Sequence, residues 1–318
     1  MIYNKAGASI SNPYTLSGSI PNIAYNKAGE QIWAKFVPSH AVSNKFDMTL
    51  LYDIPDIGGG TQGLAVDNLS KNIAQLYTGK IITIDLTDGS YVQRASTRNL
   101  GHGGAGRFES EKKNPSDLYP ALWVATQQNK TVDEDVYGQF LEVYIGESQS
   151  TINRAFFAKL PRNGSTLFAF DFDNNIAYCT IEASYYDETG WGGLIVAYDM
   201  TDVTQTTDIT YAQNPTNGNW LLGDPLWVYE TQYYREVQSS QFFDGLLCLL
   251  SDVHGVVFID IETKQEYLRL GRDVIQNHEL EGIDFLFNNQ TQQYDMVISG
   301  RTTGINEYYL YQFNLSGG

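Results

Sequence analysis

Short apolar runs separated by turn-forming residues cover most of this 318-residue chain. In each cluster of runs, a polar residue followed by a small residue opens the first run, and further runs follow it. The openings lie at Gln62-Gly63, His102-Gly103, Ser165-Thr166, Gln238-Ser239 and Glu281-Gly282. A repeat of about 40–50 residues built only of strands indicates blades packed around an axis, because one twisted blade cannot cover both of its apolar faces. The pattern therefore predicts an all-β fold, a five-bladed β-propeller.

The polar residues at these openings form the first candidate binding site. The first strand of each blade lines the central channel of a propeller, so the openings should form a ring at one mouth. The ring residues are Gln62, His102, Ser165, Gln238 and Glu281. A structural alternative remains open, in which the glycines beside His102 let crowded inner strands approach one another and His102 only hydrogen-bonds across the channel.

The outer strands can be placed by runs of alternating apolar and polar residues. Such runs are found at residues 90–95, 154–160, 208–212 and 266–270. The last unit ends with residues 308–315 and has no following outer strand, so residues 47–54 are expected to complete it and remove a free sheet edge. Three insertions are predicted to be surface loops, at residues 127–138, 185–192 and 213–225.

The composition narrows the range of partners and compartments. The formal net charge is −17, so a nucleic-acid phosphate backbone would be repelled and nucleic acid is not expected as a partner. Cys179 and Cys248 lie in different repeats and are expected to be small buried hydrophobes, not a disulfide. No apolar run is long enough to span a membrane. Residues 1–20 lack the apolar stretch of a secretion signal, so release outside the cell would need another route, such as virion release.

Carboxylates in the first strands raise the possibility of glycoside hydrolysis, which needs two of them on either side of the sugar bond. The inner-strand carboxylates are Asp67, Glu109, Asp171, Asp244, Glu281 and Asp284. Only Glu281 is expected to project from the ring, and the strand-end carboxylates are expected to serve turns. No catalytic residue is therefore assigned. A zinc site near His278 is not expected, because no second histidine falls at ligand spacing, while carboxylate-bound calcium in the channel remains open and no other cofactor is expected.

Aromatic side chains in and near the insertions are the second candidate site, because sugars stack on such rings and loops often carry binding. The candidates are Trp191, Trp220, Trp227 and Tyr233. The alternative is that these rings cap blade edges or make a subunit contact.

A repeated motif marks the N-terminal segment, residues 1–45. Tyr3-Asn4-Lys5-Ala6-Gly7 recurs word for word at residues 25–29, and each copy is predicted to be a turn between two short extended pieces. This segment is too polar and too short to close a core. Such repeats ahead of a propeller resemble the N-terminal parts of bacteriophage tail and receptor-binding proteins. The resemblance implies that residues 1–45 attach to other virion proteins or oligomerise, and that residues 46–318 form the propeller.

Taken together, the sequence predicts a phage virion protein of the tail that binds a host-surface glycan without catalysis and forms a homo-oligomer, located in the virion or otherwise outside the cell. Two alternatives are a propeller-fold glycan hydrolase with carboxylates at the channel mouth and a purely structural tail component.

Overall fold

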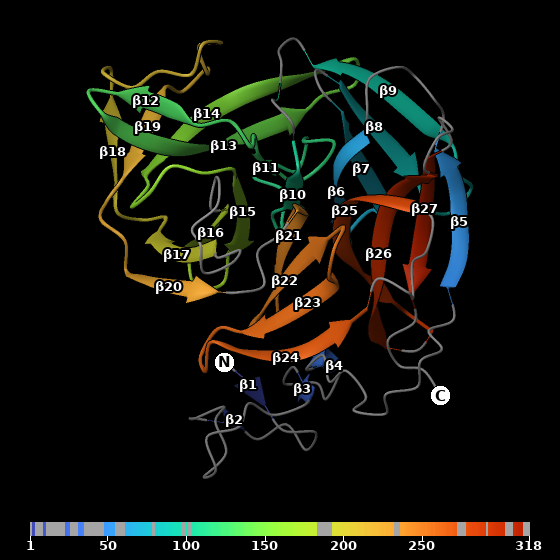
Figure 1. The fold of residues 1–318 in the computed structure, drawn as a ribbon. Helices are drawn as coiled ribbons and strands as arrows, with labels where there is room; N and C mark the ends of the chain where they lie inside the picture. The colour runs from blue at the N-terminus through green and yellow to red at the C-terminus, as the bar shows by residue number, and fades with distance from the viewer. Residues whose placement is uncertain are drawn as a thin grey trace.

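The structure, a computed structural model, is made of β strands and turns (Figure 1). The described residues are 2–3, 9–10, 23–25, 31–34, 48–54, 61–77, 80–96, 100, 103–182, 193–231, 236–271, 278–290, 292–302 and 308–313. These residues contain 27 strands and no helix, and hence no helix able to cross a membrane.

Paired strands flank the repeated N-terminal motif, whose predicted turns lie outside the described residues. The four strands are β1 (Ile2–Tyr3), β2 (Ser9–Ile10), β3 (Ile23–Tyr25) and β4 (Gln31–Ala34). β1 pairs antiparallel with β2 and β3 with β4, so each copy of the motif joins two paired strands. The two pairs meet where Tyr3 lies opposite Tyr25, the first residue of each copy. The attachment role of residues 1–45 stays a prediction.

The rest of the chain folds into four-stranded antiparallel units. Unit 1 consists of β6 (Thr61–Asp67), β7 (Asn72–Tyr77), β8 (Lys80–Asp85) and β9 (Tyr91–Ser96). Unit 2 consists of β10 (Ala105–Phe108), β11 (Leu122–Ala125), β13 (Asp135–Ile145) and β14 (Gln149–Lys159). Unit 3 consists of β15 (Thr166–Asp171), β16 (Ile176–Glu182), β17 (Gly193–Asp199) and β20 (Trp227–Thr231).

The last two units follow the same plan. Unit 4 consists of β21 (Val237–Phe243), β22 (Leu246–Ser251), β23 (Gly255–Asp260) and β24 (Gln265–Leu270). Unit 5 consists of β25 (His278–Asn288), β26 (Gln293–Thr302), β27 (Tyr308–Phe313) and β5 (Met48–Ile54). β5 pairs antiparallel with β27, Tyr309 lying opposite Asp53, so the predicted completion of the last unit by residues 47–54 is confirmed.

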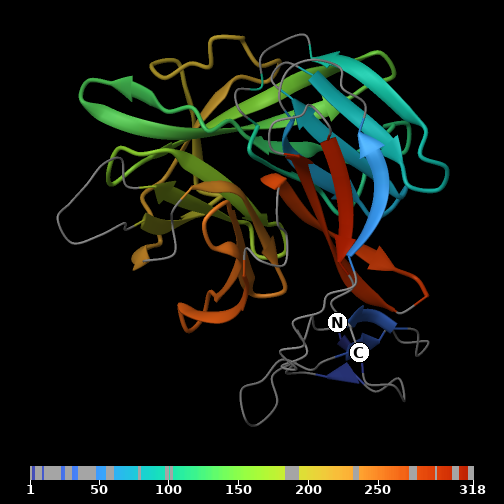
Figure 2. The same ribbon diagram turned by 45° about the vertical axis from the view of Figure 1, so that its right-hand side comes forward.

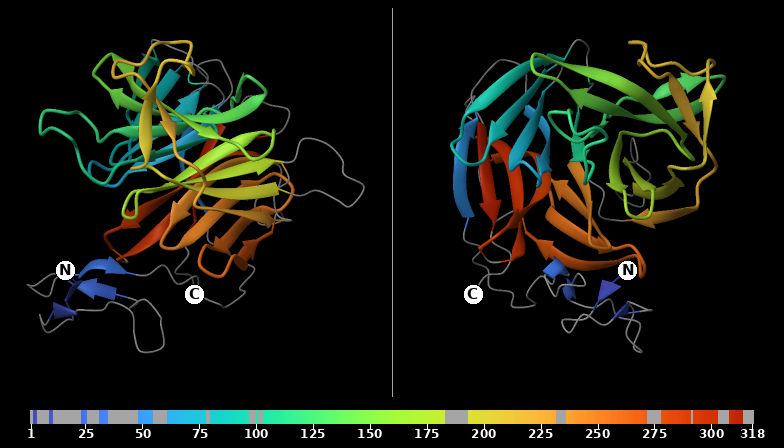
Figure 3. Two further views of the ribbon diagram at one scale, coloured as in Figure 1. Left: turned by 90° about the vertical axis from the view of Figure 1, so that its left-hand side faces the viewer. Right: turned by 180° about the vertical axis from the view of Figure 1, so that it is seen from behind.

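The first strands of the units gather at the centre and the later strands lie farther out (Figures 1 and 3). β6 packs against β25 on one side and β10 on the other, and β10, β15, β21 and β25 continue the ring. The all-β, propeller-like class predicted from the sequence is thereby confirmed. The count of five blades stays a prediction, because units 1 and 2 share one continuous sheet through a short parallel pairing of β9 with β14.

The outer strand of unit 3 is not where the sequence pattern placed it. Residues 208–212 form no strand, and their apolar side chains Ile209 and Tyr211 are buried in the core of unit 2 instead. The fourth strand is β20, whose alternating exposure directs Trp227 and Tyr229 toward the core. The prediction was wrong because alternating burial occurs in both segments, and only tertiary packing separates them.

Two predicted surface loops contain strands. Residues 127–138 include β12 (Lys130–Val132), which pairs with the start of β13 as a hairpin extension of unit 2. Residues 213–225 include β19 (Asn219–Leu222), which pairs with β18 (Val203–Thr206) and lies parallel to β14. The insertion from unit 3 therefore adds strands to the outer edge of unit 2. Figure 2 shows these strands beside the long β13–β14 pair. Residues 185–192 lie outside the described residues.

Units 2 and 3 pack through an aromatic core. Trp123 stacks on Phe156 at 5.1 Å between ring centroids, and Phe156 stacks on Phe140 at 5.0 Å. Phe140 also meets Phe168 and Phe170 of unit 3. Such pairs contribute about 0.5–1.5 kcal/mol each beyond their burial, so this core holds one face of unit 2 rigidly against unit 3. Two free cysteines, one in β16 and one in β22, are buried, as the sequence predicts.

Candidate functional site

Three of the predicted ring residues lie in first strands, and a fourth directly precedes one. Gln62 lies in β6, Gln238 in β21 and Glu281 in β25, while Ser165 directly precedes β15. His102 lies outside the described residues. Whether these residues bind a ligand stays a prediction.

Glycines let the first strands meet closely at this mouth. The Gly63 amide donates a hydrogen bond of 2.8 Å to the Gly103 carbonyl, and a Cβ atom on Gly63 would collide with that same carbonyl. A Cβ atom on Gly282 would lie 2.5 Å from the Leu64 nitrogen. These contacts favour the structural explanation for the glycines, in which they serve backbone approach between strands.

Gln238 is already used in a hydrogen-bond chain that joins three units. Its carbonyl accepts from Gln127 Nε2 of unit 2, and its own Nε2 donates to Asp252 Oδ2 at 3.0 Å. Asp252 Oδ1 accepts from the Leu280 amide of unit 5 at 2.9 Å. These hydrogen bonds link units 2, 4 and 5 through Gln238 and Asp252, while ligand binding by Gln238 stays a prediction.

Farther along the axis, three first strands bring together a buried polar cluster. Arg107 donates to the Phe242 carbonyl and to Gln241 Oε1, and Gln241 Nε2 donates to the Gly106 carbonyl. Asp284 accepts from the Val66 amide at 2.7 Å and from its neighbour's amide. Burial raises the pKa of Asp284 to about 6, although Arg107 and these hydrogen bonds oppose the rise. The hydrogen bonds of this cluster therefore join first strands of four units to one another.

Two of the strand-end carboxylates, Asp67 and Asp171, serve turns as predicted, but Glu109 does not. Asp67 accepts from the Leu69 amide and the Ser70 hydroxyl, and Asp171 accepts twice from Asn174. Glu109 Oε1 instead accepts from the Trp123 indole nitrogen at 2.9 Å. Glu109 therefore belongs to a different arrangement, on the face of unit 2 toward unit 3.

A cross-strand row and a β-bulge build that arrangement. Arg107, Trp123, Glu142 and Arg154 lie opposite one another on β10, β11, β13 and β14, and directly paired residues of antiparallel strands share a face. The register of β14 shifts beside Glu142, which leaves Asn153 as an extra residue. Bulges re-aim side chains, and this one lets both Asn153 and Arg154 reach Glu142.

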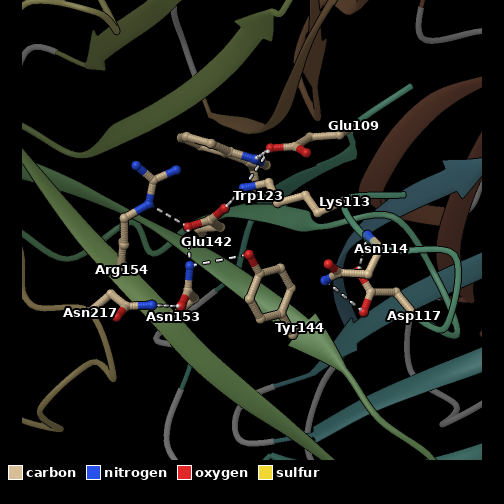
Figure 4. Close-up of polar contacts among 10 residues, drawn as sticks. All are labelled: Glu109, Lys113, Asn114, Asp117, Trp123, Glu142, Tyr144, Asn153, Arg154 and Asn217. Atoms are coloured by element: carbon tan, nitrogen blue, oxygen red, sulfur yellow. Dashed lines mark hydrogen bonds and ion pairs between the residues drawn. The ribbon is translucent and has the colours of Figure 1, made fainter. Parts of the chain in front are cut away.

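Glu142 is a fully buried carboxylate held from three sides (Figure 4). Its Oε2 accepts from Arg154 Nε at 2.5 Å and from Asn153 Nδ2 at 2.6 Å, and its Oε1 forms an ion pair with Lys113. Burial alone would raise the pKa of Glu142, but the hydrogen bonds from Arg154 and Lys113 outweigh it and the pKa is lowered. Glu142 therefore stays ionised and fixes the Arg154 guanidinium.

A hollow of about 340 Å³ opens beside this cluster. Its lining consists of Glu109, Ser110, Glu111, Trp123, Arg154, Phe156, Phe172, Asn175 and Met200. We call it the Arg154 pocket. Its volume lies at the lower end of the roughly 300–1,000 Å³ range of small-ligand pockets. Part of the lining follows first strands, residues 109–111 after β10 and Phe172 after β15. The rest comes from later strands, with Trp123 in β11 and both Arg154 and Phe156 in β14.

The aromatic candidates lie elsewhere. Trp220 in β19 donates its indole N–H to the Asn217 carbonyl, and Trp227 in β20 packs near Tyr178 with the Lys264 ammonium 5.0 Å from its ring centre. Both are half-buried and packed against the core. These contacts favour the structural alternative, and glycan binding by the two rings stays a prediction. Trp191 and Tyr233 lie outside the described residues.

The sequence analysis missed the residues that build the pocket, apart from Glu109. Trp123, Glu142 and Arg154 lie inside strands whose patterns look like ordinary β-structure, and the register shift beside Glu142 has no sequence signal. Among the described residues, no three histidine, cysteine or acidic side chains gather as a metal site would require. Calcium in the channel stays a prediction.

No protein-family model and no curated protein matches this sequence. Solved structures resemble it at low identity. The glutaminyl cyclase of Myxococcus xanthus is 8% identical over 84% of this chain and 96% of its own (TM-score 0.45). The WD40 β-propeller domain of Doa1 is 10% identical over 84% and 97% (TM-score 0.39), and a luciferin-regenerating enzyme is 9% identical over 85% and 95% (TM-score 0.44).

Proposed function

We propose that this chain is a binding protein of a bacteriophage tail, and that its propeller-like body holds a host-surface glycan in the Arg154 pocket. The observation that carries the proposal is the guanidinium of Arg154, which is fixed by a buried carboxylate and faces a hollow. Phe156 and Phe172 give that hollow apolar walls. Sugar sites combine such walls with a few fixed polar groups, because a sugar ring has an apolar C–H face and a polar rim.

The phage assignment rests on the N-terminal motif. The strands on either side of the two motif copies form two pairs that meet at Tyr3 and Tyr25, and this arrangement suits a docking or oligomerising segment. Its partners would be other virion proteins or further copies of this chain.

A glycan hydrolase is the second candidate, because two carboxylates, Glu109 and Glu111, line the same pocket. Glycoside hydrolysis needs such a pair. Glu142 cannot serve as one of them, since its side chain is fully buried and held by two cations.

The test is a binding screen of the purified chain against host-surface glycans, with product analysis for each hit. We expect binding without turnover, loss of binding in Arg154→Gln, and unchanged binding in the control Arg269→Gln. Arg269 pairs with Glu266 on β24, far from the pocket in sequence and in unit. Turnover abolished by Glu109→Gln or Glu111→Gln would establish the hydrolase, and no binding by any glycan would favour a purely structural tail component.

A further inference from the structure

The Arg154 pocket presents hydrogen-bond donors in a fixed direction. Arg154 Nε is bound to Glu142, and the guanidinium carbon lies 5.0 Å from the ring centre of Phe156 and 5.9 Å from that of Trp123. Its two terminal nitrogens have no hydrogen-bond partner within the described part of the chain. Figure 4 shows them pointing away from Glu142. Because the side chain is 29% exposed, these nitrogens can donate to a ligand.

An acceptor lies on the other side of Trp123. Glu109 uses Oε1 for the Trp123 indole N–H and for Lys113 at 3.4 Å. Its second oxygen, Oε2, has no partner among the residues that the structure describes. The pocket thus offers donors from β14 and an acceptor from the end of β10. Adjacent hydroxyl groups can accept from one side and donate to the other, because each hydroxyl does both.

The charges of the hydrogen-bonded cluster beside the pocket balance one another. Arg154 and Lys113 carry two positive charges, and Glu142 and Glu109 carry two negative charges within the same hydrogen-bonded cluster. Glu111 adds a further negative charge at the pocket, and the whole chain carries a net charge of −17. An anionic ligand would add uncompensated negative charge here, whereas a neutral ligand would not.

From these observations we infer that the pocket takes an uncharged sugar whose adjacent hydroxyls bridge the terminal nitrogens of Arg154 and Oε2 of Glu109. The C–H face of the sugar ring packs on Phe172, the half-buried aromatic of the lining, and on Met200. This inference rests on the proposed glycan binding and specifies the class of sugar.

The experiment is calorimetric titration of the full chain with neutral hexosides, with uronic acid glycosides and with their carboxyl-reduced counterparts. We expect neutral sugars to bind and uronates to bind more weakly than their reduced forms. Affinity for the neutral sugar should change less than about twofold between about 0.1 M and 1 M salt, over which the Debye length falls from about 10 to 3 Å.

Variants test the two contacts separately. Arg154→Lys keeps the positive charge but loses the two terminal donor nitrogens of the guanidinium. Glu109→Gln replaces the accepting Oε2 with a donating amide nitrogen. Each variant should weaken binding at least about tenfold, or about 1.4 kcal/mol. Arg269→Gln should bind as the unmodified chain does. Unfolding transitions of all variants serve to exclude loss of the fold.

The outcomes separate the inference from the proposed function. Tighter binding of uronates than of their reduced forms, with a steep salt dependence, would overturn the uncharged sugar and leave glycan binding in place. Neutral binding unaffected by both pocket variants would overturn the placement in this pocket. Absence of binding to every sugar tested would overturn both the proposed function and this inference.

Discussion

The axis and the Arg154 pocket each contain an arginine and a buried carboxylate. The hydrogen-bond partners of these groups and the direction of the carboxylate pKa shift differ between the two places. Arg107 and Arg154 lie in one cross-strand row of unit 2. At the axis, Arg107 donates to protein carbonyls and burial raises the pKa of Asp284. Beside the pocket, Arg154 Nε donates a hydrogen bond to Glu142, and the pKa of Glu142 is lowered despite burial. A buried carboxylate that is ionised and paired can orient an arginine for a ligand, whereas one that is closed in by backbone amides only joins strands.

The largest effect on stability is expected from disturbing the close approach of the first strands at Gly63. Gly63→Ala places a methyl group against the backbone of the neighbouring unit, which cannot move without separating the first strands. We expect it to lower the free energy of unfolding by about 3 kcal/mol or more, measured by urea denaturation. Ser165→Ala, at an exposed position before β15, is the control and should change it by less than about 0.5 kcal/mol. A well-tolerated Gly63→Ala would contradict the close approach.

Asp284 should make stability fall as the pH rises. The folded state holds a proton on Asp284 up to about pH 6, whereas the unfolded chain releases it near pH 3.9. Between these values the folded state binds more protons, so the free energy of unfolding should decrease by about 3 kcal/mol from about pH 4 to 6 and stay lower above.

Urea denaturation across this pH range measures the slope, and Asp284→Asn should remove it. Glu262→Gln, an exposed change in the turn after β23, should leave the slope intact. The same slope in Asp284→Asn would mean that another group carries the proton.

Glu142, beside the pocket, should have the opposite pH dependence, because its contribution to the free energy of unfolding is lost as the pH falls. The lowered pKa of Glu142 means that its contribution is present above the unfolded pKa near 4.3 and is lost as the pH falls through the folded value. Glu142→Gln should cost about 2 kcal/mol at neutral pH, below the usual cost of breaking a buried pair because Lys113 and Arg154 are about one-third exposed. It should also weaken sugar binding by freeing Arg154.

The matched control for this change is Glu266→Gln, which removes an exposed pair with Arg269 and should cost at most about 0.5 kcal/mol. An equal decrease in the free energy of unfolding for the two variants would show that burial of the Glu142 ion pairs adds nothing to stability. Full sugar binding in Glu142→Gln would show that Arg154 needs no positioning.

The smallest effect is expected at a candidate aromatic that the structure places outside the pocket. Lys264→Met removes the cation from the Trp227 ring and should cost about 0.5–1 kcal/mol of stability. Glycan affinity should not change, because neither residue lines the pocket. Titration of the variant with the best-binding glycan measures this, and a loss of affinity would return Trp227 to the binding surface.

The strands could be predicted from the sequence much better than the site. The polar-small openings lie at or just before the first strand of every unit, and the missing outer strand of the last unit correctly pointed to residues 47–54. Residues 208–212 misled because Ile209 and Tyr211 alternate like strand residues while packing into another unit. Glu142 and Arg154 could not be paired in advance, because their meeting depends on a one-residue register shift at Asn153 that only the folded sheet defines.

The pairing of β5 with β27 has a consequence for how the chain folds. Tyr309 lies opposite Asp53, so the last unit is closed by segments at opposite ends of the propeller-like region. β5 is synthesised before every other strand of that region, and its partner β27 is synthesised after all of them. Contacts of such large sequence separation form slowly, and a chain that has not yet closed exposes an unpaired strand edge. The time between synthesis of β5 and its capture by β27 is therefore the period in which aggregation would compete with folding.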